Sequence, residues 1–211
     1  MPRIKEEVIH EFTIEKSRFI TYLQRIDNEE EAKAYITKIK KMHPNANHHC
    51  SAFIYGDHSE FQRSSDDGEP SGTAGVPMLE CLRKNDMQNI VAVVVRYFGG
   101  IKLGAGGLIR AYSKSISLAL ENATLVEAKK MQEYICTFSY DLIGPLDYYF
   151  SKHNIQILDK QYEEKVTYTY ICEHDITDEL MEMSKGKIIN TYQKECIIEC
   201  EIKNKDSYKN K

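Results

Sequence analysis

The stretch RYFGGIKLGAGGLIRAY, residues 96–112, marks the point where a core strand is expected to give way to a helix. The apolar run at 90–95 before it is typical of a strand buried on both faces. Beyond it, apolar residues recur at helical spacing and predict a helix over 107–122. Glycines at such a junction let backbone N–H groups turn outward and allow a partner to approach the chain closely.

The charged residues in and after this stretch are all basic, and no Asp or Glu occurs from residue 87 to residue 120. A helix start with free N–H groups attracts anions, and nearby cations strengthen that attraction. The alternative is a tight turn whose glycines only satisfy backbone geometry. We expect a surface that binds phosphate or nucleic acid, formed by Arg96, Lys102, Gly104, Gly106, Gly107, Arg110 and Lys114.

The composition, with 42% hydrophobic and 28% charged residues, is that of a soluble globular protein. No apolar run approaches the roughly 18 residues of a membrane helix, and the charged N-terminal stretch lacks the apolar core of a signal peptide. We therefore expect a cytoplasmic protein with no membrane partner. The net charge of −4 argues against a general polyanion binder, so a nucleic-acid site would be a local basic patch.

The first part of the chain predicts a mixed α+β domain. Hydrophobic periodicity and turn residues give the order of its elements. We expect strands at 9–14, 17–26, 50–55 and 90–97, and helices from about 29 to 42, from 73–77 to about 85, and at 107–122. The polar segment 61–75 and the segment 124–130 are predicted to be a loop and a connector.

The second part of the chain predicts a different order of elements. We expect strands at 132–140, 155–162, 166–172 and 187–202, and helices at 144–153 and 177–184. The resulting βαββαβ order is that of a ferredoxin-like domain. We therefore predict two domains, 1–128 and 129–203, and a charged tail, 204–211, that is disordered.

Asp66, Asp67 and Glu69 place three carboxylates within four residues of a glycine-containing loop. Such a cluster could bind Mg²⁺ or Ca²⁺ through oxygen ligands, although its spacing is not that of an EF-hand. Two structural alternatives are that the aspartates cap backbone N–H groups or that the carboxylates neutralise the basic residues of 96–112. We predict no metal and no cofactor.

The sequence His48-His49-Cys50 suggests a cysteine–histidine pair. Residues two apart on a strand share a face, so His48 could pair with Cys50, whereas His49 could not easily do so. A nucleophilic cysteine also needs a lowered pKa. No nucleophile elbow, Walker loop or zinc-protease motif occurs, so the sequence leans away from an enzyme and leaves any catalytic residue unknown.

Together these motifs resemble the signature of the IMPACT family, whose bacterial members are often called YigZ. The resemblance covers about residues 1–125 and includes the sequence KSRF at 16–19, the loop SSDDGEPSGTAGVP and the glycine-rich stretch. His49 departs from the family pattern, which more often has a small polar residue there. The residues that the resemblance assigns to the family motif are His48, Cys50, Ser65, Asp66, Asp67, Gly68, Glu69, Pro70, Ser71, Gly72 and Thr73.

The resemblance implies two α/β sandwich domains. The first would be like the fourth domain of elongation factor G, a ribosomal-protein-like fold with a left-handed crossover, and the second would be ferredoxin-like. Eukaryotic members act in translational control, by interfering with activation of a kinase that senses amino-acid starvation. We therefore expect a translation-linked regulatory protein that binds RNA or the ribosome. The alternatives are a metal-assisted enzyme acting on a small phosphorylated substrate and a protein-binding adaptor in stress control of translation.

Overall fold

The computed structural model describes residues 1–202, so the tail predicted to be disordered lies outside the described residues. The chain divides into two compact units, which we call unit 1 (residues 1–127 and the described residues from Cys200) and unit 2 (residues 128–199). Both combine helices with sheet strands, which confirms the predicted α+β class. Within residues 1–202 no helix is long and apolar enough to cross a membrane.

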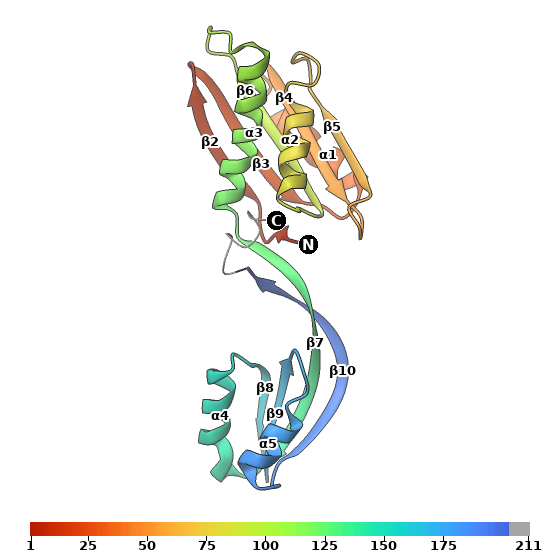
Figure 1. The fold of residues 1–211 in the computed structure, drawn as a ribbon, viewed down its shortest axis with the longest axis vertical. Helices are drawn as coiled ribbons and strands as arrows, with labels where there is room; N and C mark the ends of the chain where they lie inside the picture. Colours follow the sequence, from red (N-terminus) through yellow and green to blue (C-terminus); the bar gives the residue numbers. More distant parts are fainter. Residues whose placement is uncertain (203–211) are drawn as a thin grey trace. The chain divides into compact units, whose positions relative to one another are not determined.

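Unit 1 is built on a five-stranded sheet with the strand order β2-β3-β6-β4-β5 (Figure 1). All neighbouring strands in it are antiparallel. The central strand is β6, and its residues from Ile90 to Arg96 are all buried, as the apolar run predicts. The strands are β2 (Val8–Ile14), β3 (Ser17–Arg25), β4 (His48–Tyr55), β5 (Phe61–Ser65) and β6 (Ile90–Tyr97).

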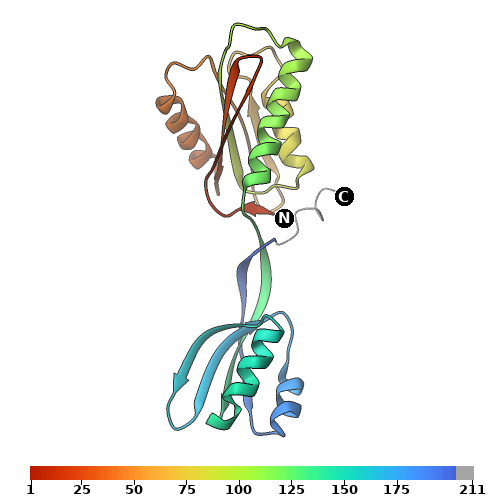
Figure 2. The ribbon, with the colours of Figure 1, turned by 90° about the vertical axis from the view of Figure 1, so that its left-hand side faces the viewer.

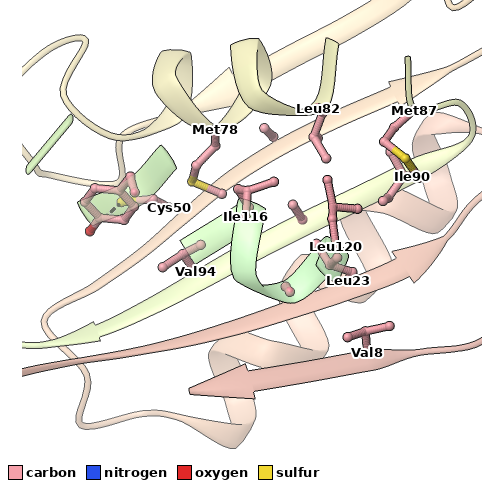
Figure 3. Close-up of a cluster of buried hydrophobic side chains, with 14 of the residues drawn as sticks. Val8, Leu23, Cys50, Met78, Leu82, Met87, Ile90, Val94, Ile116 and Leu120 are labelled. Carbon is pink, nitrogen blue, oxygen red and sulfur yellow. Dashed lines mark hydrogen bonds between the residues drawn. The ribbon is translucent and has the colours of Figure 1, made fainter. Parts of the chain in front are cut away.

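Three helices cover the two faces of this sheet. Figure 2 shows α1 (Glu29–Met42) on one side, and α2 (Gly75–Lys84) and α3 (Gly104–Asn122) on the other. The side chains between α2, α3 and the sheet form one hydrophobic cluster, which includes Met78 and Ile116 (Figure 3). The side chains beneath α1 form a separate cluster. The sheet is therefore buried on both faces, and the glycine-rich stretch leads into the helix that packs on one of them.

Two segments expected to be irregular form strands instead. Residues 61–65 form β5, whose five residues are all exposed, so no apolar alternation marks it. It is an edge strand held by backbone pairing with β4. Most of the expected connector 124–130 belongs to β7 (Leu125–Phe138), which pairs at its start with the short strand β1 (Arg3–Ile4). Backbone pairing, which the side-chain pattern does not reveal, decides both cases.

Unit 2 has its own aromatic core. The rings of Phe138 and Phe150 pack against Tyr168, and Tyr134 stacks on Tyr170. In its sheet β7 pairs with β9 and β10, and β9 also pairs with β8. After β7 come α4 (Ile143–Lys152), β8 (Gln156–Tyr162), β9 (Val166–Cys172), α5 (Thr177–Ser184) and β10 (Ile189–Glu201).

Candidate functional site

The motifs of the first part of the chain meet at one pocket in unit 1, with a volume of about 430 Å³. Its walls come from the start of β4, the carboxylate loop, the end of β6 and the beginning of α3. The two motif groups of the sequence therefore form one site. The pocket is lined by Asn47, His48, Glu69, Pro70, Arg96, Phe98, Lys102, Leu103, Gly104, Ala105 and Leu108.

A buried ion pair between Arg96 and Glu69 lies at this site. Arg96 Nη1 donates to Glu69 Oε1 over 2.6 Å, and neither side chain is more than 5% exposed. Arg96 Nη2 donates to Ser17 Oγ over 3.3 Å. Arg96 was expected on an outward cationic surface, and here the structure differs. Its charge is neutralised by the carboxylate loop, as one of the alternatives proposed, because a buried charge is costly without a partner.

Strand register places Arg96 among the other motif residues. It lies directly opposite His48 on β4 and opposite Phe19 on β3. Its guanidinium carbon is 5.5 Å from the ring centroids of both Phe19 and Phe98, a cation–π distance. Its Nε is buried and has no hydrogen-bond partner among the described residues. The central strand β6 thus places the Arg96 guanidinium in the pocket lining, and its Nε forms no hydrogen bond within the described residues.

Tyr112 on α3 connects the ion pair to the cysteine of the motif. Its hydroxyl donates to Glu69 Oε1 over 2.8 Å, and the Cys50 thiol lies 3.3 Å from the same hydroxyl and 3.0 Å from the Asp66 carbonyl oxygen. Burial raises the pKa of Tyr112 and raises the pKa of Cys50 to about 12. Cys50 therefore stays a thiol at neutral pH, and its position argues for holding the loop rather than for nucleophilic catalysis.

His48 faces the pocket in a defined orientation. Its Nδ1 lies 2.9 Å from the Asp67 carbonyl oxygen, which can only accept, so Nδ1 carries the hydrogen. In the neutral ring Nε2 then has the lone pair, and it lies 3.8 Å from Glu69 Oε2. Gly68, with a φ of +87°, lies against the ring, since an added Cβ would be 3.5 Å from Nδ1. His48 therefore bonds to the loop backbone and does not pair with Cys50.

Asp66 caps the start of α2 from outside the helix. Its carboxylate accepts hydrogen bonds from the N–H groups of Gly72, Ala74 and Gly75 over 2.8–3.0 Å. The residue at the N-cap position, Ala74, offers no side-chain acceptor. Burial alone would raise the pKa of Asp66, but the three backbone donors together hold it below its ordinary value. This is the capping role that the sequence left open.

Asp67 is also engaged in holding the loop. It accepts from the His49 N–H group and from Lys40 Nζ, each over 2.7 Å. Beside it, the Thr73 hydroxyl donates to the Pro70 carbonyl oxygen over 2.7 Å, and Ser71 is exposed. In the described part of the chain, no group of three or more His, Cys, Asp or Glu side chains is placed to hold a metal ion.

Three other predicted cations lie at the surface. Lys102, Arg110 and Lys114 are exposed, and among residues 1–202 none of them forms a salt bridge. Helix α3 begins at Gly104, earlier than the expected residue 107, with no side-chain cap and no acidic residue in its first turn. Gly106 and Gly107 therefore belong to the first helical turn. We call Lys102, Arg110, Lys114 and the N–H groups of this turn the α3 cationic surface.

Two residues that the sequence analysis did not single out fix the loop before α3. Ser17 Oγ accepts from the Gly99 N–H group over 3.2 Å, and Asn47 Oδ1 accepts from the Phe98 N–H group over 2.8 Å. Gly99 is required, because an added Cβ would overlap the backbone of Lys16. Neither Ser17 nor Asn47 belongs to a periodic pattern, so hydrophobic periodicity does not indicate its role. Ser17 is, however, part of the KSRF sequence at 16–19.

Comparison with known proteins identifies the family. Residues 15–120 match the Impact N-terminal domain, and residues 136–183 match a domain of unknown function, DUF1949. The chain is 46% identical over 188 residues to the IMPACT family member YvyE of Bacillus subtilis (strain 168), which covers 87% of each chain. It is 41% identical over 152 residues to YigZ of Escherichia coli (strain K12), which covers 71% of this chain and 74% of that one. The chain belongs to the IMPACT family, which confirms the resemblance seen in the motifs.

A solved structure shares the fold over both units. It is described as a hypothetical protein, is 34% identical to this chain and aligns with a TM-score of 0.59. The alignment covers 92% of this chain and 97% of the other. The mixed α+β, two-unit organisation is therefore found in a relative as well.

Proposed function

We propose that this chain is a translation-linked regulatory protein that binds RNA or the ribosome through unit 1. Membership of the IMPACT family supports the link to translation, because eukaryotic members of that family act in translational control. The observation that carries RNA binding is the α3 cationic surface. It combines an uncapped helix start with three exposed basic side chains that have no carboxylate partner within residues 1–202.

Phosphate groups fit this surface for two reasons. The N-terminus of a helix carries the equivalent of roughly half a positive charge, and its N–H groups hydrogen-bond anions directly. Arg110 and Lys114 are four residues apart on α3, where like charges repel by a few tenths of a kcal/mol. A phosphate between them would offset that repulsion. The net charge of −4 confines polyanion binding to such a local patch.

We infer that unit 1 follows the fold of the fourth domain of elongation factor G, with its left-handed crossover, and that unit 2 is ferredoxin-like. The order β10-β7-β9-β8, with two helices in a βαββαβ chain order, supports the second assignment. The likeness of unit 1 to a domain of a ribosome-binding factor supports the proposed binding by analogy.

The test is a salt titration of binding to a fluorescently labelled single-stranded RNA, followed by anisotropy. Three to four phosphate contacts predict a log–log slope of about −2 to −3. Arg110→Glu should weaken binding by about tenfold or more. It should also make the log–log slope shallower by the amount that one phosphate contact contributes. The matched control is Lys41→Glu, an exposed lysine on α1, on the opposite face of the sheet, and it should change affinity little.

Two results would contradict RNA binding. One is an affinity that does not respond to salt, and the other is an equal loss in both charge-reversal variants. A pull-down in which nuclease treatment leaves one specific protein bound would favour the adaptor alternative. The same titration with purified ribosomes separates a ribosomal site from free RNA.

A further inference from the structure

The pocket beside the α3 cationic surface has features that a surface for an RNA backbone does not need. Its volume of about 430 Å³ falls within the range of small-ligand sites, roughly 300–1,000 Å³. Apolar side chains of Phe98, Leu103 and Leu108 line it together with the charged side chains of Arg96 and Lys102. Backbone phosphates require exposed cations but neither a cavity nor an apolar wall.

The charged end of the pocket suits an anion with several acceptor atoms. Gly104 and Ala105, in the uncapped first turn of α3, line it next to Lys102. The carboxylate of Glu69 is neutralised by Arg96, so Lys102 and the helix terminus leave the lining positive. Arg96, another residue of the pocket lining, is 4% exposed, and its buried Nε is a donor without a partner in the described residues.

His48 favours a phosphomonoester over a phosphodiester. Its Nδ1–H is held by the Asp67 carbonyl oxygen, so Nε2 of the neutral ring can accept a hydrogen bond. A phosphomonoester has a second pKa near 6, so near neutral pH part of it keeps a P–OH proton that can be donated to Nε2. An internal phosphodiester has no such proton and carries one charge less. The polar groups therefore match the end of a nucleotide chain better than its interior.

The apolar wall matches a base. Phe98 is 44% exposed at the pocket, and nucleic-acid bases stack on exposed aromatic rings. We propose that the pocket binds the terminal phosphomonoester of one nucleotide, with the phosphate at the start of α3 and Lys102 and the base against Phe98. The source is either a free nucleoside monophosphate or the 5′-phosphorylated end of RNA. In the second case the inference rests on the proposed function and makes it specific for 5′ ends.

The experiment uses the full chain and five probes. Calorimetry compares adenosine 5′-monophosphate, adenosine and inorganic phosphate, and anisotropy compares two 3′-labelled RNA octamers that differ only in a 5′-phosphate or a 5′-hydroxyl. We expect the monophosphate to bind at least about tenfold more tightly than either adenosine or phosphate. Adenosine cannot form the charge-assisted hydrogen bonds of the phosphate group, and inorganic phosphate has no base to stack on Phe98. The 5′-phosphorylated octamer should exceed the 5′-hydroxyl octamer by a similar factor.

Ala105→Glu tests where the ligand binds. It puts a carboxylate at an exposed pocket position in the first turn of α3, where an acidic residue suits the helix. We expect monophosphate binding and the 5′-phosphate preference to disappear. Ala34→Glu makes the same change at an exposed position of α1, on the opposite face of the sheet, and should leave both unchanged.

The outcomes separate this inference from the proposed function. Equal binding of both octamers, with no monophosphate binding, overturns the pocket assignment and leaves RNA binding in place. Monophosphate binding without any RNA binding supports the pocket with a free nucleotide as its source and contradicts RNA binding. A 5′-phosphate preference that survives Ala105→Glu, or phosphate binding as tightly as the monophosphate, also overturns the pocket assignment.

Discussion

At the scale of single residues, Glu69 has the most demanding position in the site. One oxygen, Oε1, accepts from both Arg96 and Tyr112, and the other faces His48. Neutralisation of the basic residues of 96–112 by the carboxylate loop was expected as an alternative, but the pattern of residues does not determine which carboxylate pairs with Arg96. Three carboxylates and several cations are close in sequence, and only the strand register and the loop backbone decide which pair is buried.

Glu69→Gln should destabilise the folded chain by about 3 kcal/mol or more. The amide keeps an acceptor for Tyr112 but removes the charge opposite a guanidinium that is 4% exposed, and an unpaired buried charge carries a cost of this size. Urea denaturation followed by circular dichroism measures the change. The control is Glu80→Gln on α2, because its ion pair with Arg83 is exposed and should contribute less than about 1 kcal/mol. Equal losses in the two variants would argue against the role given to Glu69.

At the scale of elements, the sequence predicts strands and helices where apolar side chains recur at regular spacing. It does not predict strands that are held mainly by backbone pairing. The buried run of β6 and the start of α1 at Glu29 were both expected and are observed. The edge strand β5 and the first residues of β7 were not expected. Helix α3 begins at Gly104, whose φ of +69° favours glycine, and Gly106 and Gly107 continue it, whereas glycine in a sequence favours a loop assignment.

The start of α2 gives a prediction for acid stability. The pKa of Asp66 is lower in the folded chain than its ordinary value. Its carboxylate therefore stabilises the fold at pH values above the unfolded pKa, and that contribution is lost as the pH falls through the folded pKa. Asp66→Ala should lower the free energy of unfolding at pH 7 by about 1–2 kcal/mol, as for the loss of a helix cap. Below pH 4 the difference from the unmodified chain should shrink.

Urea unfolding at a series of pH values measures this difference. Asp57→Ala is the matched control, since the Asp57 carboxylate is exposed and accepts no hydrogen bond among residues 1–202. Its unfolding curves should follow those of the unmodified chain. If the loss caused by Asp66→Ala were constant down to pH 2, the charge on Asp66 would not be what holds the start of α2.

At the scale of the whole molecule, the chain forms two separate cores and returns to the first at its end. The Ile202 N–H group donates to the Leu125 carbonyl oxygen, and Lys5 pairs with Glu201, so unit 1 includes both ends of the described chain. The βαββαβ periodicity was readable from the sequence. The return of the last strand to unit 1 was not, because it depends on backbone pairing between residues far apart in the chain.

Separate cores predict separate stabilities. Phe150 in α4 is 1% exposed and packs on Tyr168 and Tyr170, so Phe150→Ala should destabilise unit 2 by about 3–5 kcal/mol. Hydrogen exchange read by mass spectrometry should show faster exchange in β8 and β9 and unchanged protection in β6, because Phe150 belongs to a cluster without unit 1 residues. Binding of single-stranded RNA should also be unchanged. Ile116→Ala in α3 is the reciprocal variant, expected to loosen β6 and to spare β9. Parallel loss of protection in both units from either substitution would mean that the two cores unfold as one.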